Sequence, residues 1–396
     1  YTPNNQTQTK TMSSTAHKSK EEKKEYFDPE EELDKKAKVL AEQIRNSKHF
    51  VAFTGAGIST SAGIADFRSG VDTKLATGPG AWEKKATGYN KKPAVSKPMH
   101  SAIPTPTHMA LVALERAGYL KYLISQNVDG LHRKSGFPSR KLAELHGNTN
   151  LEVCRSKGCG KQYLRDFRTR TAQKVHDHQT SRKCENCGGK LYDSIINFGE
   201  NLPEYELTEG FRQSEKSDLM LCLGSSLRVT PAADMPLETA RNKGQLVIVN
   251  LQSTPLDKYS TRINGFIDNV MIKVMKYLDL EIPEFSLKRR LNITKSYDQA
   301  KKVSTLKLRG VDDKGDPYQV FKSIEVKLAD SKENFTSDKD PMVVKPKSDL
   351  QKGKMTMKFG FHGHYSECPF EVDIDLDRIL WEQPNYFMLE YSVKTG

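Results

Sequence analysis

Short apolar runs alternate with helical patterns through the first part of the chain. The runs at 50–54, 119–125, 142–145, 219–223 and 246–250 are apolar at successive positions, which is typical of strands buried on both faces of a parallel sheet. Parallel strands are joined by crossover segments that are usually helical, so this alternation predicts an α/β fold with a doubly wound (Rossmann-like) parallel sheet.

Two helical stretches lie beside these runs. In the first, apolar residues recur at helical spacing, at Leu33, Ala37, Leu40, Ala41 and Ile44. In the second, Thr105 can cap a helix, Pro106 stands at its first position and Gly118 can end it. We therefore expect two helices here, the first ending near Asn46.

Small and polar residues follow the predicted strands directly. The pieces GAG, QN, HG, GSS and NLQ each come after one of the apolar runs. Doubly wound sheets bind ligands beyond the carboxyl ends of their strands, so we expect one crevice to gather all five pieces. Residues 68–103 contain several Gly, Pro and Lys residues with little periodicity, and they predict a flexible loop over that crevice or a small subdomain.

The ends of the chain have different patterns. The polar, lysine-rich residues 1–25 predict a disordered tail in front of a folded domain over 26–285. Residues 286–302 are basic and predict a linker, in which KRRLNITKSYDQAKK is either a bipartite nuclear import signal or a solvated stretch. Alternation of polar and apolar positions predicts a small antiparallel β domain over 303–396.

Composition limits the classes of partner. Apolar residues make up 36% of the chain and mean hydropathy is -0.66. We expect no membrane partner, because no run of about 18 apolar residues occurs, and we expect an intracellular protein, because the N-terminal residues lack the apolar core of a secretory signal. The formal charge of +12 favours loose, salt-sensitive contact with nucleic acid or chromatin, with solubility as the simpler use of that charge.

Four of the six cysteines stand in two close pairs, Cys154 with Cys159 and Cys184 with Cys187. Four thiolates can close a tetrahedron around Zn2+ and leave no position for water, so the pairs predict one structural zinc ion in an inserted module over about 148–195. His176 and His178 lie between the pairs. We expect them to be surface loop residues, with zinc ligation as the alternative.

The first strand end has the composition of a phosphate-binding loop. Gly55, Ala56 and Gly57 carry no bulky side chains, so backbone N–H groups and a helix N-terminus can approach an anion. The stretch is not the dehydrogenase fingerprint G-x-G-x-x-G, because five residues rather than two separate Gly57 from Gly63. On these residues alone, a simple turn of the chain is the alternative.

Seven motifs occur in order along the chain, GAGIST, GIADFR, SQNVDGLH, ELHGN, FGE, LCLGSSL and IVNLQ. Together they resemble the sirtuin family of NAD-dependent protein deacylases over roughly residues 30–285. Within the family, the stretches THMALVALERAGYLKYLISQNVDGLHRKSGFP and KLAELHGN are most similar to the nuclear class IV members. Residues 303–396 show no such resemblance, and the sequence assigns them no function.

The resemblance implies where NAD and the reacting groups would lie. The positions that match the family's cofactor site are Gly55, Ala56, Gly57, Thr60, Asp66, Phe67, Arg68, Trp82, Gln126, Asn127, His146, Gly224, Ser225, Ser226, Asn250, Leu251, Gln252 and Ile267. The implied catalytic residues are His146, Asn127 and Asp129.

The residue types suit these implied roles. An imidazole titrates near neutral pH, so His146 can take a proton from a ribose hydroxyl, whereas a packing role is the alternative for a lone histidine. Asn127 and Asp129 can fix the ribose or a water molecule, although both residue types also favour turns. His132 is expected to be structural.

The resemblance further implies a nuclear NAD-dependent protein-lysine deacylase that acts on histones or other nuclear proteins and releases nicotinamide and O-acyl-ADP-ribose. Deacetylation is the expected reaction, and long-chain deacylation is left open. An acylated lysine peptide would bind as an added strand, with Ile196 and Phe198 beside the lysine stem. The alternatives are a mono-ADP-ribosyltransferase and a non-catalytic NAD-binding chromatin scaffold.

Overall fold

The computed structural model describes residues 19–329, 333–347 and 350–393. Contacts between residues divide the chain into two compact units. Unit 1 contains the described residues up to Asn148 together with Lys174–His176 and Ser194–Phe285. Unit 2 contains Thr149–Gln173, Asp177–Asp193 and the described residues from Ser286 onward. The cysteine-bearing module, which we expected within the domain over 26–285, therefore groups with the C-terminal strands.

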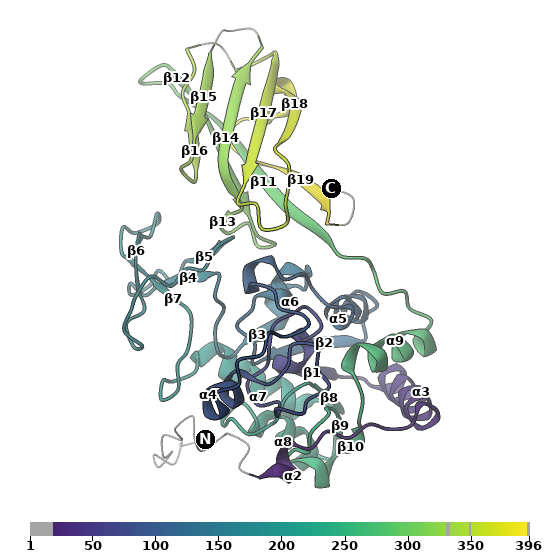
Figure 1. Cartoon of the computed structure of the whole chain (residues 1–396). Helices are drawn as coiled ribbons and strands as arrows, with labels where there is room; N and C mark the ends of the chain where they lie inside the picture. Colours follow the sequence, from purple (N-terminus) through teal and green to yellow (C-terminus); the bar gives the residue numbers. More distant parts are fainter. Residues whose placement is uncertain (1–18, 330–332, 348–349, 394–396) are drawn as a thin grey trace. The chain divides into compact units, whose positions relative to one another are not determined.

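Unit 1 is built on a six-stranded parallel sheet with strand order β10-β9-β8-β1-β2-β3 (Figure 1). Its strands are β1 (Phe50–Thr54), β2 (Leu120–Ser125), β3 (Leu142–Glu144), β8 (Leu219–Leu223), β9 (Gln245–Val249) and β10 (Thr261–Ile263). Central strands β1 and β8 are buried at every position, as their continuous apolar runs predict. All five predicted strands are confirmed. The strand order reverses between β1 and β8, which is where such sheets place their ligand site.

Helices cover both faces of this sheet, which confirms the doubly wound fold. Helices α3 (Glu30–Asn46), α5 (Pro106–Arg116) and α9 (Ile267–Leu278) share one apolar core with it. On the other face, α7 (Glu204–Lys216) and α8 (Asp234–Arg241) pack against a second core. Thr105 caps α5, as predicted, by accepting a hydrogen bond from the N–H of His108. Among the described residues, no helix has the length and hydropathy needed to cross a membrane.

The shorter helices of unit 1 are α2 (Lys20–Lys23), η1 (Ala56–Ser59), α4 (Ala81–Thr87), η2 (Met99–Ser101), α6 (Leu131–Lys134), η3 (Ser139–Lys141) and η4 (Asp257–Tyr259). Helix α2 corrects the predicted disordered tail over residues 1–25. The Ser19 hydroxyl accepts from the N–H of Glu22 at 3.1 Å, and the Glu22 carboxylate accepts from the N–H of Ser19. This capping box orders the end of the predicted tail. Residues 1–18 lie outside the described residues.

Unit 2 contains a small sheet that carries the cysteines, with strand order β13-β5-β4-β7-β6. Its strands are β4 (Leu151–Cys154), β5 (Gln162–Arg165), β6 (Gln179–Lys183), β7 (Lys190–Asp193) and β13 (Tyr318–Gln319). Strand β13 comes from the C-terminal part of the chain and pairs in parallel with β5. The module and the C-terminal strands are therefore joined by backbone hydrogen bonds within unit 2.

The rest of unit 2 is a β-sandwich of two antiparallel sheets, ordered β16-β12-β11-β19 and β15-β14-β17-β18. Their strands are β11 (Ser286–Asp298), β12 (Val303–Val311), β14 (Phe321–Leu328), β15 (Asn334–Ser337), β16 (Met342–Val344), β17 (Lys354–Phe361), β18 (Phe370–Asp375) and β19 (Pro384–Ser392), with the short helix η5 (Leu376–Arg378). Residues of both sheets share one buried core. The predicted antiparallel β domain is thus confirmed, although it begins at Ser286.

The predicted linker over 286–302 is wrong for its first thirteen residues, because they form strand β11. Alternate side chains of β11 point into the unit, and two of these inward positions are basic. Arg289 is 3% exposed and Lys295 is 1% exposed. These two charges hid the period of a half-buried strand in the sequence. They also remove support for the import signal, since buried side chains do not present a solvated basic cluster.

Candidate functional site

Every residue predicted to bind the cofactor or to act in catalysis lines one cavity of about 1680 Å³ in unit 1. Most of these residues lie beyond the carboxyl ends of β1, β2, β3, β8 and β9 and in the loop after η1, while Trp82 lies in α4 and Ile267 begins α9. The structure thus brings the five strand-end pieces together in one crevice, as the strand pattern predicts. The roles assigned to the individual residues remain predictions.

Glycines let two of these strand ends approach each other closely. A Cβ on Gly55 would lie 2.6 Å from the carbonyl oxygen of Gly224, and one on Gly57 would lie 2.7 Å from Gly224 Cα. Gly224 itself has a φ of 63°, which favours glycine. The N–H of Gly57 donates to Gly224 at 2.9 Å, and that of Gly55 donates to Leu223 at 2.9 Å. These two N–H groups therefore join the loops, which differs from the expected contact with an anion.

His146 follows β3, and its ring is oriented through Nδ1, which lies 2.9 Å from the carbonyl oxygen of Gln126. A carbonyl oxygen can only accept a hydrogen bond, so in the neutral ring Nδ1 carries the proton and Nε2 holds the lone pair. Burial lowers the pKa of His146 below its ordinary value of 6.5; the hydrogen bond to Gln126 opposes this shift and the charge of Arg68 adds to it. The ring is therefore neutral at pH 7 and can accept a proton at Nε2.

Asn127 and Asp129 are held by backbone and by Ser59. The Ser59 hydroxyl donates to Asp129 at 2.7 Å, and the Asn127 amide donates to the carbonyl oxygen of Gly55 at 3.0 Å. Burial raises the pKa of Asp129, while the hydrogen bonds from Ser59 and from the N–H of Leu131 oppose that shift. Ser59 lies inside the GAGIST motif, but nothing in the sequence distinguished it from its neighbours. Its role in orienting these two side chains is visible only in three dimensions.

A cation and three aromatic rings form another wall of the cavity. The Arg68 guanidinium lies 4.4 Å from the centre of the Trp82 ring, and this ring packs 5.4 Å from Phe67 and 5.8 Å from Phe198. Burial lowers the pKa of Arg68 to about 10, against the opposing charge of Asp66. Arg68 is therefore protonated at neutral pH, and its charge favours an anionic ligand such as a phosphate.

Several of the remaining predicted cofactor residues are held by hydrogen bonds to one another or to the backbone. The Ser225 hydroxyl donates to the side-chain oxygen of Gln126 at 2.7 Å. The Asn250 amide donates to the carbonyl oxygen of Gln252 at 2.9 Å, and the Thr60 hydroxyl donates to that of Gly57 at 3.0 Å. Ser226, Leu251 and Ile267 line the same cavity.

The predicted substrate-side residues Ile196 and Phe198 also line the cavity. Two residues from the insertion between the cysteine pairs, Val175 and His176, join them there. The carbonyl oxygen of Val175 accepts a hydrogen bond from the Asn197 amide at 2.8 Å. Sequence reasoning missed these two residues, because no motif or period marks them.

His132 has the structural role that we expected. Its Nε2 lies 2.9 Å from the hydroxyl of Thr54, and its ring packs 4.8 Å from that of His108. Burial lowers the pKa of His132 to about 3, so the ring is neutral and part of the core.

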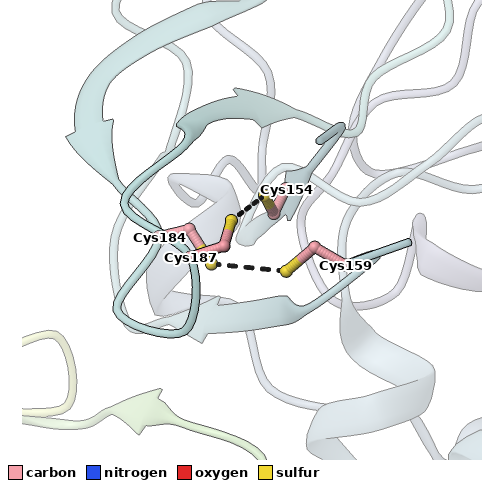
Figure 2. Close-up of side chains that lie close together, drawn as sticks. All are labelled: Cys154, Cys159, Cys184 and Cys187. Carbon is pink, nitrogen blue, oxygen red and sulfur yellow. Dashed lines mark hydrogen bonds between the residues drawn. The ribbon is translucent and has the colours of Figure 1, made fainter. Parts of the chain in front are cut away.

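The four predicted zinc ligands come together in unit 2 (Figure 2). All four sulfur atoms lie within 4.8 Å of one another. The sulfur of Cys154 is 3.5 Å from that of Cys187, and the sulfur of Cys159 is 3.6 Å from that of Cys184. Four thiolates bound to Zn2+ at about 2.3 Å would stand about 3.8 Å apart. The cluster therefore fits one structural zinc ion.

The expectation that His176 and His178 are surface loop residues is wrong for His178. His178 is buried, and its Nδ1 lies 3.0 Å from a carboxylate oxygen of Asp193. His176 is exposed and lies 2.8 Å from Glu200. Neither histidine belongs to the cluster of sulfur atoms.

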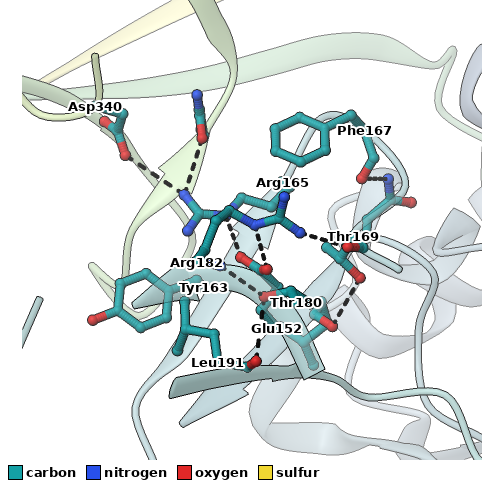
Figure 3. Close-up of polar contacts among 12 residues, drawn as sticks. Glu152, Tyr163, Arg165, Phe167, Thr169, Thr180, Arg182, Leu191 and Asp340 are labelled. Atoms are coloured by element: carbon teal, nitrogen blue, oxygen red, sulfur yellow. Dashed lines mark hydrogen bonds and ion pairs between the residues drawn. The ribbon is translucent and has the colours of Figure 1, made fainter. Parts of the chain in front are cut away.

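A network of mostly buried charges lies on strands β4, β5 and β6 of unit 2 (Figure 3). The fully buried Glu152 carboxylate accepts hydrogen bonds from Arg165, at 2.9 Å, and from Arg182. Arg165 also approaches Asp340 of the β-sandwich, at 3.9 Å. Charges that satisfy one another inside the protein indicate a structural role.

The chain is similar in sequence to several known proteins. A family model described as the Sir2 family matches residues 55–231. The chain is 44% identical to the NAD-dependent protein deacetylase SRT1 of Arabidopsis thaliana over 331 residues, which cover 81% of this chain and 67% of that protein. It is 41% identical to the NAD-dependent protein deacetylase Sirt6 of Drosophila melanogaster over 270 residues, which cover 66% of this chain and 81% of that protein.

The chain spans about two thirds of the length of the plant relatives that it matches. Among solved structures, one described as a complex of Sir2 with a p53 peptide and NAD+ is 33% identical, with a TM-score of 0.44, and the match covers 60% of this chain and 96% of that one.

Proposed function

The chain belongs to the Sir2 family of NAD-dependent protein deacetylases, and on this premise we propose that it removes acyl groups from lysine side chains of histones or other nuclear proteins. The proposed products are nicotinamide, the deacylated lysine and O-acyl-ADP-ribose. The observation that carries this proposal is the orientation of His146, whose Nδ1 faces a carbonyl oxygen at 2.9 Å so that Nε2 holds a lone pair in the cavity.

The walls of the cavity suit NAD. A volume of about 1680 Å³ accommodates a dinucleotide together with a lysine side chain. The contacts between Gly55, Gly57 and Gly224 leave no room for a Cβ, so the loops that carry the predicted phosphate ligands can stay close together. Arg68 supplies a positive charge for the pyrophosphate. NAD, when bound, supplies a ribose carbon whose bond to nicotinamide can be broken.

The residues of the chain then have distinct tasks. Nε2 of His146 takes a proton from a ribose hydroxyl, because the neutral ring is the form present at pH 7. Asn127 and Asp129, which are oriented by Gly55 and Ser59, hold the ribose or a water molecule in place. Ile196 and Phe198 lie beside the stem of the acyl-lysine.

The choice of nuclear protein substrates rests on the resemblance to class IV members of the family. The basic stretch over 288–302 does not add support, because its first part is the ordered strand β11. The formal charge of +12 supports loose contact with nucleic acid or chromatin, which added salt would weaken. An assay that compares an acetyl group with a long-chain acyl group measures which length of acyl group is removed.

One assay tests the proposal and separates the alternatives. The protein is incubated with NAD and with histone peptides that carry either an acetyl or a long-chain acyl group on lysine. Free nicotinamide, deacylated peptide and ADP-ribose attached to protein are then measured. We expect nicotinamide release that depends on the peptide and matches the loss of acyl groups one for one.

Two results would contradict the proposal. Labelled protein without acyl loss would indicate a mono-ADP-ribosyltransferase. Binding of NAD without turnover of any peptide would indicate a scaffold.

A further inference from the structure

A short N-terminal segment crosses several loops of the cavity in unit 1. Its residues Glu22 to Asp28 begin in α2, where Glu22 closes the capping box, and end before α3. The contacts of this segment with cavity loops are Glu22 with Arg228, Lys23 with Glu83, Glu25 with Lys74, Tyr26 with Leu251 and Asp28 with Asn264. These partners lie in four separate segments of the chain, so one short segment ties them together.

The contact of Lys23 with Glu83 fixes helix α4. The ammonium group of Lys23 lies 2.8 Å from the Glu83 carboxylate, whose side chain is only 9% exposed. Glu83 directly follows Trp82 in α4. The N–H of Trp82 donates to the carbonyl oxygen of Phe67 at 3.1 Å, so α4 is joined to the turn that carries Arg68. The position of α4 therefore determines where the Arg68 guanidinium and the Trp82 ring lie on this wall of the cavity.

The neighbouring residues contact two other loops of the cofactor site. The Glu22 carboxylate lies 3.2 Å from the guanidinium of Arg228, two residues after Ser226. The N–H of Tyr26 donates to the carbonyl oxygen of Leu251 at 2.9 Å. Both partners lie in loops that follow strands of the parallel sheet. The segment thus links the loop with α4 to loops anchored on β8 and β9.

We propose that residues 22–28 form a clasp over the cofactor site and that Lys23 is a positioning residue for NAD binding. This inference rests on the proposed function for its ligand, whereas the clasp itself rests on the contacts above.

The loop over 66–102 has little regular structure apart from α4 and η2. Most of its printed backbone hydrogen bonds join residues of the loop to one another, such as Gly80 to Ser69 and Val95 to Ala76, so contacts with other segments help to hold the loop in one arrangement. The ion pair between Lys23 and the nearly buried Glu83 carboxylate holds α4 in place. It thereby keeps most molecules in the loop arrangement that binds NAD.

The physical expectation concerns affinity more than chemistry. When only a fraction of the molecules has the binding arrangement, the apparent Kd rises in inverse proportion to that fraction. Lys23→Gln leaves a polar side chain that is one atom shorter and removes the positive charge that faces the Glu83 carboxylate. His146, Asn127 and Asp129 are untouched by this change, so kcat at saturating NAD should stay the same.

Tryptophan fluorescence gives a readout that does not require turnover. The chain has two tryptophans, and Trp381 lies in the β-sandwich of unit 2, so a Trp381→Phe background leaves Trp82 as the sole reporter. In that background we expect Lys23→Gln to make Trp82 more accessible to acrylamide. We also expect it to raise the Kd for NAD roughly five-fold, with the KM for NAD raised in parallel.

Lys24 supplies a matched control one residue away. Its side chain is 58% exposed, lies 4.0 Å from Glu21 and stands 5.1 Å from the centre of the Tyr26 ring. Lys24→Gln removes the same charge without touching a cavity loop, so it should leave quenching and NAD affinity unchanged. The charge swap Lys23→Glu with Glu83→Lys should restore much of the affinity.

Two results would overturn the inference, and a third would separate it from the proposed function. Equal quenching and equal Kd for Lys23→Gln and the parent protein would overturn the clasp. A general fall in melting temperature that the charge swap does not repair would also overturn it, because Lys23 would then only stabilise the fold. If the parent protein fails to bind NAD while the quenching difference persists, the proposed function fails and the clasp stands.

Discussion

Both units of the protein bury charged and titratable side chains, but they use them differently. In unit 1, His146 and Arg68 line a large cavity, and burial lowers the pKa of each. In unit 2, the Lys295 ammonium donates to two backbone carbonyl oxygens, at 2.8 and 3.1 Å, and Arg289 bonds to Asp166 and Glu367. Burial alone therefore does not mark a functional group.

What separates the two sets is where their partners lie. The charges of unit 2 meet partners within the same unit, so they fix the packing of the β-sandwich and the cysteine module. The groups of unit 1 border a space large enough for a ligand, so a bound molecule can complete their interactions. If this distinction holds, substitutions of the buried charged residues in unit 2 should lower the stability of the fold, and substitutions of cavity residues in unit 1 should lower the rate of turnover.

The largest effect is expected from loss of the zinc site. Cys184→Ser removes one of four thiolates, and structural zinc contributes on the order of 10 kcal/mol in small zinc domains. We expect the variant to lose its metal and unit 2 to lose its cooperative melting transition, measured by calorimetry with metal analysis. Cys368→Ser, at an exposed cysteine of the same unit, should retain both. A Cys184→Ser protein that lacks metal and melts like the parent would contradict the assignment.

The second prediction concerns the proposed base. His146→Ala should lower kcat by roughly 10²- to 10⁴-fold, the usual contribution of general base catalysis. It should leave NAD affinity and melting temperature nearly unchanged, which separates it from the variants of unit 2. His49→Ala is the matched control, because His49 bonds to Gln213 and does not line the cavity. Full activity of His146→Ala would exclude its role as the base.

The third prediction tests a buried charge of unit 2. Glu152→Gln removes the anion between Arg165 and Arg182, and breaking a buried ion pair costs about 3 to 5 kcal/mol. Chemical denaturation should show this loss, while the KM for NAD stays the same. Glu325→Gln, at the more exposed pair with Lys327, should cost much less, because water screens an exposed pair. Similar losses of unfolding free energy for the two variants would mean that burial does not govern the strength of these ion pairs.

The smallest effect is expected from pH. The pKa of His146 is lowered, so the neutral, active form persists at pH 7 and above and is lost only as pH falls through a value below 6.5. A profile of kcat/KM should therefore be flat near neutrality and decline below pH 6.5. Decline that begins well above pH 7 would show that the environment of His146 favours its cation.

Much of unit 1 could be predicted because its pattern is simple. Strands buried on both faces appear as continuous apolar runs, and the residues that follow them meet at one edge of the sheet. The cysteine cluster was predictable for a similar reason, since two close pairs of thiols limit the geometry. The glycines were recognised, but their main contact is the close approach of the loops after β1 and β8.

Other features were hidden because they depend on contacts distant in sequence. The sequence of strand β11 predicts a linker because Arg289 and Lys295 occupy inward positions, and their partners lie far along the chain. The ordered segment after Ser19 lies within the predicted tail, although S-x-x-E is a local helix signal. Ser59 and Val175 have no distinguishing pattern at all, and only the fold brings them to the cavity.

The most direct test of this account is a crystal structure of the protein with intact NAD and an unreactive acyl-lysine peptide. We predict that a ribose hydroxyl lies within hydrogen-bonding distance of Nε2 of His146, with the pyrophosphate near Arg68 and Ser225. A nicotinamide ribose bound outside this cavity, or a His146 Nε2 directed at another protein group, would contradict it.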